Sequence, residues 1–299
     1  MLQDIERYLA CPLCTQALTR HDRSLRCPAG HSFDVAKQGY VSLLAGDAHT
    51  GTGDTAEMVA ARADFLAAGH YRPIADALAE AAAAALAGES EAESEAESEA
   101  EPEPESESEA DGLVADLGAG TGHYLAHVLD ALPGSVGAAL DISKYALRRA
   151  AKAHPRIGAV VCDAWRPLPL RDASVELMLN VFAPRNGPEI RRVLRPGGTL
   201  LLVSPTARHL RELVDALGLL SVDEEKQRRI DEKLGPYLTP GARREVEFTL
   251  RLGPQDVRTV VGMGPSAWHT DPERLGAALA ALPDPVEVTA SVTVAAYRR

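Results

Sequence analysis

Three cysteines and one histidine near the start of the chain have the spacing of a metal site. Cys11 and Cys14 are separated by two residues, and Cys27 and His31 by three. The Pro and Gly of CPLC and CPAGH favour tight turns, here called knuckles, that direct each pair of ligands at one ion. Zn²⁺ prefers four nitrogen or sulfur ligands in a tetrahedron, and a site filled entirely by protein ligands is structural. The spacing therefore predicts one structural Zn²⁺, whose binding supplies much of the folding free energy of this small module.

Two other residues compete for this metal site. The fourth cysteine, Cys162, lies in VVCDA, which has the pattern of a buried strand in a different part of the fold. His21 has no partner at knuckle spacing. Neither is therefore predicted to be a ligand.

A glycine-rich turn is the second candidate site. The stretch DLGAGTGHY follows an apolar run and precedes a helical pattern, so its backbone can approach a ligand closely at a helix N-terminus. The glycines of this turn are Gly118, Gly120 and Gly122. A nicotinamide or flavin site, or a vestigial one, can have the same pattern.

Three aspartates favour S-adenosylmethionine as the ligand of this turn. Asp116, in the strand before the first glycine, is placed to meet a cationic amino-acid group. Asp141, at the end of the next strand-like run, is placed to accept both ribose hydroxyls. Asp163 ends the third run, where an adenine amino group would lie.

The elements that must position these residues alternate between strand and helix. Near-continuous apolar runs separated by helical stretches indicate a parallel sheet covered on both faces. These runs span residues 113–119, 136–143, 158–164, 175–182 and 198–206, and residues 244–253 and 285–299 alternate apolar with polar side chains like strands near a sheet edge. The loop 180–186 should face the methyl group of the cofactor, because ligands bind at the carboxyl ends of parallel strands.

Residues 54–87 have a helical pattern. Asp54 and Glu57 form a predicted capping box at its start, and AGHYRP at 68–73 interrupts it. The second helix is expected to end before Gly88.

Residues 89–110 carry almost all of the net charge of −12. Glu occupies every odd position from 89 to 109, and without these eleven residues 31 basic side chains face 32 acidic ones. This composition, with two prolines, predicts a disordered and solvated linker. The alternative is an acidic mimic of nucleic acid that screens a basic site.

The N-terminus MLQDIERYLA carries charges and has no apolar core of a signal peptide. No apolar run reaches the length of a membrane span. We therefore expect a cytoplasmic protein with reduced thiols and no membrane partner.

Several stretches together resemble the RlmA-type 23S ribosomal RNA (guanine-N1)-methyltransferases. They are CPLC…CPAGHSFDVAKQGYVSLL, DTAEMVAARADFLAAGHYRP, DLGAGTGHY, ALDISKYALRRAAK, FAP, LRPGGTLLLVSPTARHL and GPSAWHT. The resemblance implies an α/β fold, a Rossmann-like class I S-adenosylmethionine-dependent methyltransferase with a seven-strand mixed sheet and a small N-terminal zinc-ribbon-like domain. It also implies a homodimer.

The implied domain organisation has four parts. They are a zinc-binding RNA-recognition module at 1–45, a helical connection at 46–88, the Glu-rich insert at 89–110 and the S-adenosylmethionine-binding methyltransferase domain at 111–299. The zinc ligands carried over by the resemblance are Cys11, Cys14, Cys27 and His31, and the cofactor contacts are Tyr71, Gly122, His123 and His209.

The implied activity is methylation of N1 of a guanine in helix 35 of 23S ribosomal RNA. The family has two groups, which modify guanine 745 or guanine 748, and overall similarity favours the second. That group is associated with resistance to tylosin-like macrolides.

Two other functions remain open from the sequence. A small-molecule methyltransferase would explain the near-neutral body of the protein, but such substrates need no zinc module. A zinc-containing RNA-binding protein without catalysis is disfavoured by the glycine-rich turn and Asp141. Expected RNA contacts are Arg20, Arg23, Arg26 and the basic segment 226–244.

The base that accepts the N1 proton is not identified, although Asp163 and Asn180 lie near the relevant strand ends. The two tryptophans, Trp165 and Trp268, are expected to be core aromatics rather than platforms for base stacking.

Overall fold

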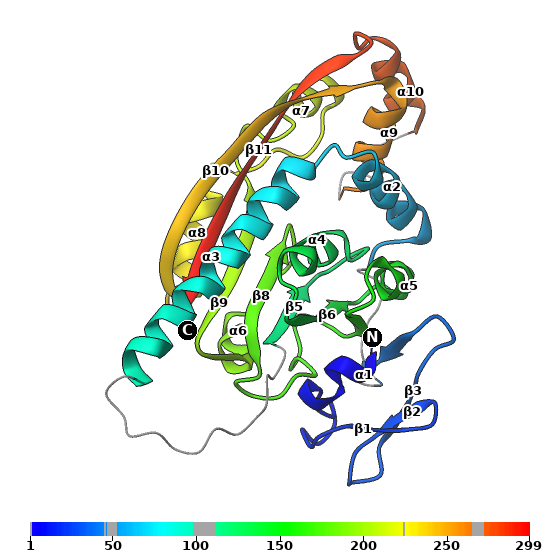
Figure 1. Ribbon diagram of the computed structural model, residues 1–299. Coiled ribbons are helices and arrows are strands. Elements are labelled where there is room, and N and C mark those ends of the chain that lie inside the picture. Colours follow the sequence, from blue (N-terminus) through cyan, green and yellow to red (C-terminus); the bar gives the residue numbers. More distant parts are fainter. Residues whose placement is uncertain (1, 45, 47–52, 98–111, 224, 265–271) are drawn as a thin grey trace.

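The computed structural model describes residues 2–44, 46, 53–97, 112–223, 225–264 and 272–299. One large sheet runs through the molecule, and a small second sheet lies beside it (Figure 1). The strands of the large sheet are, in spatial order, β10 (Thr239–Leu252), β11 (Val286–Arg298), β9 (Leu194–Pro205), β8 (Val175–Val181), β5 (Gly112–Leu117), β6 (Ser135–Asp141), β7 (Ile157–Val161) and β4 (Tyr40–Ser42). Every strand expected from the apolar and alternating runs is present.

The strand order reverses at β5, which pairs in parallel with β6 on one side and β8 on the other. In parallel sheets, ligands bind outside the carboxyl ends of the strands at such a reversal. The glycine-rich turn follows β5 and therefore lies at this position. Only β11 runs antiparallel, between β9 and β10, so the sheet is mixed as expected.

The large sheet has eight strands and not seven. The additional strand is β4, whose residues Tyr40 and Ser42 pair in parallel with Ala159 and Val161 of β7. A three-residue strand is too short to produce a periodic pattern, so only the tertiary pairing reveals it. The last strand of the segment assigned to the metal module thus extends the methyltransferase sheet and covers its edge.

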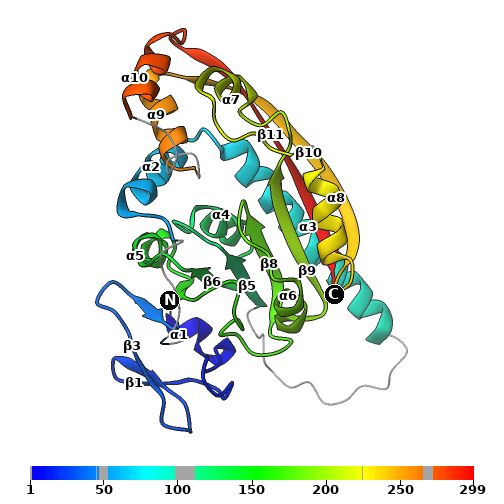
Figure 2. The same cartoon turned by 180° about the vertical axis from the view of Figure 1, so that it is seen from behind.

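Helices cover both faces of the sheet, as the near-continuous apolar strands predicted (Figures 1 and 2). One face is packed by α3 (Arg72–Glu97), α4 (His123–Ala131) and α5 (Lys144–Ala153). The other is packed by α1 (Leu2–Ile5), α6 (Gly187–Val193) and α8 (Lys226–Leu234). At the far end of the long antiparallel pair β10–β11 lie α7 (Arg211–Leu217), α9 (Pro254–Gly262) and α10 (Pro272–Ala280), with α2 (Ala56–Ala67) against α9 (Figure 1).

The N-terminal segment forms the small sheet. It contains a 3₁₀ turn at Glu6–Tyr8 and three short antiparallel strands, β1 (Thr19–His21), β2 (Ser24–Arg26) and β3 (Ser32–Asp34). Its apolar side chains are continuous with the core of the large sheet, because Leu25 belongs to the same buried cluster as Leu113 and Val160.

Two details of the helical segment differ from the prediction. The N-cap of α2 is Thr55, whose hydroxyl accepts a hydrogen bond from the Met58 amide at 3.2 Å, while Asp54 instead forms an ion pair with Arg62. The helix expected to end before Gly88 continues as α3 to Glu97. Its Ala-rich sequence and the Glu and Ala residues that follow are good helix formers, and this propensity outweighs the single glycine. The remaining insert positions, 98–110, lie outside the described residues.

Trp165 is not a core residue. Its side chain is 68% exposed in the loop that follows β7, and its amide donates to the Asp163 carboxylate at 2.9 Å. This turn directs the indole outward, which the sequence pattern did not show. Trp268 lies outside the described residues.

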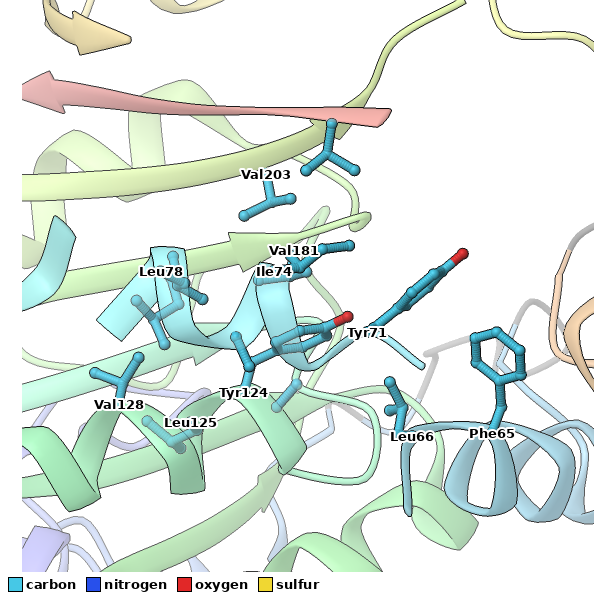
Figure 3. Close-up of a cluster of buried hydrophobic side chains, with 14 of the residues drawn as sticks. Phe65, Leu66, Tyr71, Ile74, Leu78, Tyr124, Leu125, Val128, Val181 and Val203 are labelled. Atoms are coloured by element: carbon cyan, nitrogen blue, oxygen red, sulfur yellow. The ribbon is translucent and has the colours of Figure 1, made fainter. Parts of the chain in front are cut away.

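A buried cluster joins the start of α3 to the sheet beside the glycine-rich turn. Figure 3 shows Tyr71, Ile74 and Leu78 packed over Tyr124 and Val181, with the Tyr71 hydroxyl directed away from the cluster. Over the described residues, the structure contains no helix with the length and hydropathy of a bilayer-spanning segment.

Candidate zinc and cofactor sites

The two predicted knuckles are formed by backbone hydrogen bonds. In the first, the Cys11 amide donates to Gln16, and the Thr15 amide donates back to the Cys11 carbonyl, both at 2.8 Å. In the second, the Gly30 amide donates to the Cys27 carbonyl at 2.9 Å, and Gly30 has a φ of +87° that favours glycine. Each knuckle holds two ligands on the same side of the turn.

The four ligand atoms converge to the size of a Zn²⁺ site. The Sγ atoms of Cys14 and Cys27 are 3.6 Å apart, and His31 Nδ1 lies 3.3 Å from Cys27 Sγ and 3.5 Å from Cys11 Sγ. All four atoms lie within 4.8 Å of one another. Zinc–ligand bonds of about 2.0–2.3 Å in a tetrahedron place neighbouring ligand atoms roughly 3.3–3.8 Å apart, so the set fits the ion.

Cys162 is not part of this set. It is 3% exposed, and burial raises the pKa of its thiol far above the ordinary value. Its position directly after β7 agrees with its exclusion as a ligand. The four residues expected from the sequence are the ones whose ligand atoms converge in the structure.

The glycine-rich turn is packed too closely for larger residues. A Cβ atom on Gly118 would lie 2.4 Å from the Ala183 Cβ, in the loop after β8. A Cβ atom on Gly122 would lie 3.0 Å from Ala150 of α5. Both glycines also have positive φ values, +83° and +77°. The turn consequently brings the loops after β5 and β8 together at the carboxyl ends of the strands.

Asp116 provides the test of whether the turn fits the expected cofactor. Its side chain is 1% exposed, and its Oδ1 atom has no hydrogen-bond partner among the described residues. Burial, together with the charge of Asp141, raises the pKa of Asp116 to about 8. A buried acceptor without a partner is costly in an isolated protein, and the ammonium group of S-adenosylmethionine would satisfy it. The residues therefore fit the cofactor.

Asp141 braces the turn from the end of β6. Its two oxygens accept hydrogen bonds from the amides of Gly120 at 2.9 Å and Ser143 at 2.8 Å. Each carboxylate oxygen retains a further lone pair for a ribose hydroxyl. Burial raises the pKa of Asp141, and the hydrogen bonds from the Ser143 and Gly120 amides partly offset this increase.

Asp163 lies at the neighbouring strand end beside a small pocket. The pocket has a volume of about 240 Å³ and is lined by Pro12, Leu43, Leu44, Cys162, Asp163, Arg166 and Pro167. The lining combines apolar side chains with one carboxylate and one guanidinium, and the adenine position of Asp163 stays a prediction. The contribution of Leu43 and Leu44, which follow β4, was not visible in the sequence.

Tyr71 and His209 are brought together although they are far apart in the chain. The Tyr71 hydroxyl lies 3.0 Å from His209 Nε2, and the Ser291 amide donates to His209 Nδ1 at 3.2 Å. Since Nδ1 accepts this bond, the proton of the neutral imidazole is on Nε2 and is donated to Tyr71. The Tyr71 hydroxyl hydrogen is then available for a different acceptor. Burial and the charge of Lys226 lower the pKa of His209 to about 4, which keeps the ring neutral.

Phe182 completes this group of rings and was missed by the sequence analysis. Its ring centroid lies 5.7 Å from His209 and 6.2 Å from Tyr71, and its side chain is 40% exposed. Its φ of +53° is unusual for a bulky residue. The buried Asn180 amide donates to the carbonyls of Leu117 and Pro184 and so ties this loop to β5.

His123 is the first residue of α4 and lies half-buried beside the turn. Its ring packs edge-on against Tyr124, with centroids 5.2 Å apart. Burial and the nearby His127 lower the pKa of His123, so its ring is neutral near pH 7. Its contact with the cofactor, implied by the resemblance, stays a prediction.

The expected RNA contacts of the metal module are on its surface. Arg20, Arg23 and Arg26 are all exposed along the β1–β2 hairpin. Asp130 and Asp172 are also exposed, and each forms an ion pair, Asp130 with His154 and Asp172 with Arg192.

Comparisons with known proteins identify the family. The zinc-ribbon family model described as RlmA, N-terminal, matches residues 9–48, and one described as a methyltransferase domain matches residues 114–198. The sequence is 56% identical to a candidate 23S rRNA (guanine-N1)-methyltransferase of Micromonospora griseorubida over 302 residues, which cover 100% of this chain and 99% of the relative. It is 48% identical over 298 residues, with the same coverage, to the 23S rRNA (guanine(748)-N(1))-methyltransferase of Streptomyces fradiae. The chain belongs to the RlmA-type 23S rRNA (guanine-N1)-methyltransferase family.

Family membership confirms the resemblance, the fold class and the two bound groups. This RlmA-type protein is a methyltransferase that uses S-adenosylmethionine and holds a structural Zn²⁺ in its Cys₃His cluster. Among solved structures, a candidate methyltransferase from Bacillus halodurans is similar over 63% of this chain and 92% of its own, at 16% identity and a TM-score of 0.42.

Proposed function

We propose that this protein methylates N1 of guanine 748 in helix 35 of 23S ribosomal RNA, in preference to guanine 745. The observation that carries the proposal is the full-length match, at 48% identity, to the Streptomyces fradiae enzyme that is named for guanine 748. Ribosomal RNA is the substrate class of the relatives at both identity levels. Modification of this guanine would contribute to resistance to tylosin-like macrolides.

The chain supplies positioning, because the sulfonium of S-adenosylmethionine already carries an activated methyl group. Asp116 would hold the ammonium group, Asp141 the ribose hydroxyls and Asp163 the adenine amino group. Gly118, Gly120 and Gly122 let the backbone approach the cofactor, and His123 contacts it from the start of α4. The hydrogen bonds from backbone amides to Asp141, and from the Asn180 side chain to backbone carbonyls, hold the loops at the strand ends in place without the cofactor.

Tyr71, His209 and Phe182 form the wall on the acceptor side. The Ser291–His209–Tyr71 chain of hydrogen bonds orients the Tyr71 hydroxyl, which would help to hold the cofactor. The exposed face of Phe182, held by a positive φ, is suited to stacking on a guanine that has left its helix. The N1 proton must leave as the methyl group arrives, so an acceptor near N1 would speed the reaction.

The zinc module supplies contacts to the RNA outside the target guanine. Arg20, Arg23 and Arg26 would contact phosphates, which adds affinity without sequence selection. The protein works in the cytoplasm, where ribosomal RNA is found, and we expect a homodimer as in the family.

The experiment is methylation of an unmodified 23S RNA transcript with labelled S-adenosylmethionine. Methylation at N1 blocks base pairing, so reverse transcription should stop beside guanine 748. A transcript with adenine at position 748 is the control and should take up no label. A stop at position 745 would reject the preferred target, and label found only in small molecules would reject the RNA substrate.

A further inference from the structure

Arg62, a residue of α2, lies over the glycine-rich turn. Its Nη2 atom forms an ion pair with Asp54 at 2.9 Å and donates a hydrogen bond to the Met263 carbonyl at 2.7 Å. These two partners come from the start of α2 and the end of α9. One edge of the guanidinium is therefore held in place by protein groups on both sides.

The other edge of the guanidinium faces the turn. A Cβ atom added to Gly120 would lie 3.4 Å from Arg62 Nη1, an ordinary van der Waals distance, so the guanidinium lies directly against the turn. Within the described ranges Nη1 has no hydrogen-bond partner, although its side chain is only 30% exposed. Arginine carries donors on both terminal nitrogens, and here one nitrogen is occupied while the other is presented to the cofactor site.

The segment that carries Arg62 is tied to the cofactor site independently. The Ser143 hydroxyl donates to the Asp54 carbonyl at 2.8 Å, and the Ser143 amide donates to Asp141 at the same distance. The positive charge of Arg62 also opposes the raised pKa of Asp141. Arg62 is thus connected to the wall of the site by its ion pair with Asp54, by the hydrogen bond of Asp54 to Ser143, and by its charge.

None of the contacts expected above binds the carboxylate of the cofactor. The amino-acid end of S-adenosylmethionine has an ammonium group and a carboxylate, and Asp116 accounts only for the ammonium. A carboxylate needs a donor, and the guanidinium is the side chain best matched to it in shape and charge. We propose that Arg62, through Nη1, binds the carboxylate of the cofactor, an inference that rests on the S-adenosylmethionine site of the proposed function.

The test compares two ligands that differ only in this carboxylate. Binding of S-adenosylmethionine and of its decarboxylated form is measured by calorimetry with the full-length protein and with Arg62→Gln. Loss of a charge-assisted contact worth about 1.5–3 kcal/mol should weaken binding of S-adenosylmethionine by roughly 10- to 100-fold. Binding of the decarboxylated form should change by less than about twofold on the same reasoning. Arg62→Lys, which keeps the charge, should restore part of the selective loss.

Arg251→Gln is the matched control, because Arg251 is exposed on β10 and pairs only with Glu287 among the described residues. It should leave the affinity for both ligands unchanged. An equal loss for both ligands in Arg62→Gln would assign a merely structural role to Arg62, and unchanged binding of both would reject the contact. If the unsubstituted protein bound neither ligand, the proposed function itself would be rejected.

Discussion

At the scale of single residues, Asp116 is a carboxyl group enclosed without a counter-charge. Its raised pKa of about 8 means that the native protein holds this proton over a range in which the unfolded chain, with an ordinary pKa near 3.9, has lost it. Between roughly pH 4 and 8 the native state therefore binds more protons, and the free energy of unfolding decreases as pH rises. The cofactor site is maintained at a cost to stability.

His209 contributes a pH dependence of the opposite sign. Its folded pKa of about 4 is below the ordinary value of 6.5, so the unfolded chain binds the extra proton between these values. The free energy of unfolding contributed by His209 therefore increases as pH rises from about 4 to 6.5. The bond to Tyr71 is unaffected above that range.

We predict that Asp116→Asn makes the protein more stable at pH 8 but weakens its binding of S-adenosylmethionine. The neutral amide removes a buried group that must ionise, so the melting temperature without cofactor should rise at pH 8 and change little at pH 5. Because one pKa unit corresponds to about 1.4 kcal/mol, the free energy of unfolding at pH 8 should increase by at most a few kcal/mol. Binding of S-adenosylmethionine should weaken at least tenfold, since the charge-assisted contact is lost.

Asp215→Asn is the control for this measurement, because Asp215 is 71% exposed on α7. It should leave both quantities unchanged at both pH values. A lower melting temperature for Asp116→Asn at pH 8 would show that Asp116 is not an uncompensated buried acid.

At the scale of elements, the site depends on the contact between the loops after β5 and β8. Gly118 and Ala183 meet at this contact, and Asn180 connects both loops to the sheet. The Gly-rich pattern indicates a tight turn, but not that the turn must also accommodate a second loop. This additional requirement comes from the parallel pairing of β5 with β8.

We expect Gly118→Ala to destabilise the protein by about 2–4 kcal/mol, as the sum of a strained positive φ and overpacking against Ala183. Gly197→Ala is a close control, since Gly197 has a φ of +82° with nothing within 4 Å of an added Cβ. That variant should lose about 1 kcal/mol, the cost of the backbone conformation alone. Urea denaturation measures both values, and equal losses would contradict the proposed crowding.

At the scale of the whole molecule, the metal module and the methyltransferase sheet form one folded body. β4 extends the large sheet, and the Ala10 amide donates to the Pro169 carbonyl at 3.1 Å. Leu9 and Leu25 share a core with residues of β5 and β7. Removal of the module would expose the edge of β7 and one apolar face, so truncation cannot isolate its role in RNA binding.

Charge removal on the surface of the module is the more selective experiment. We predict that replacing Arg20, Arg23 and Arg26 together with Gln raises the KM for RNA and reduces its salt dependence, because phosphate contacts release counterions. Affinity for S-adenosylmethionine and the melting temperature should stay unchanged. The same replacement at Arg211 of α7, Arg251 of β10 and Arg258 of α9 is the control and should leave the KM for RNA unaltered. Figure 1 shows α7 and α9 at the end of the molecule opposite β1–β3. Equal effects of the two triple variants on the KM for RNA would contradict a role of the metal module in RNA binding.

The sequence by itself determined the local chemistry of this protein. Knuckle spacing predicted the four side chains that converge in the Cys₃His cluster, because two short turns can direct ligands only when their residues are close in the chain. Apolar runs and a Gly-rich turn predicted the parallel sheet and the position of Asp116 and Asp141, since strand periodicity and backbone freedom are local properties. The sequence pattern did not predict β4, because this strand is too short to show a period. It also did not predict the exposed position of the Trp165 side chain.

Only the tertiary structure decided which distant residues meet. His209 reaches Tyr71 across 138 positions, and Arg62 reaches the turn because α2 packs between Gly120 and the end of α9. Such contacts depend on how helices pack on the sheet, and side-chain packing leaves no period in the chain. For the same physical reason, the metal module and the sheet, which are separate patterns in the sequence, share one core in the folded protein.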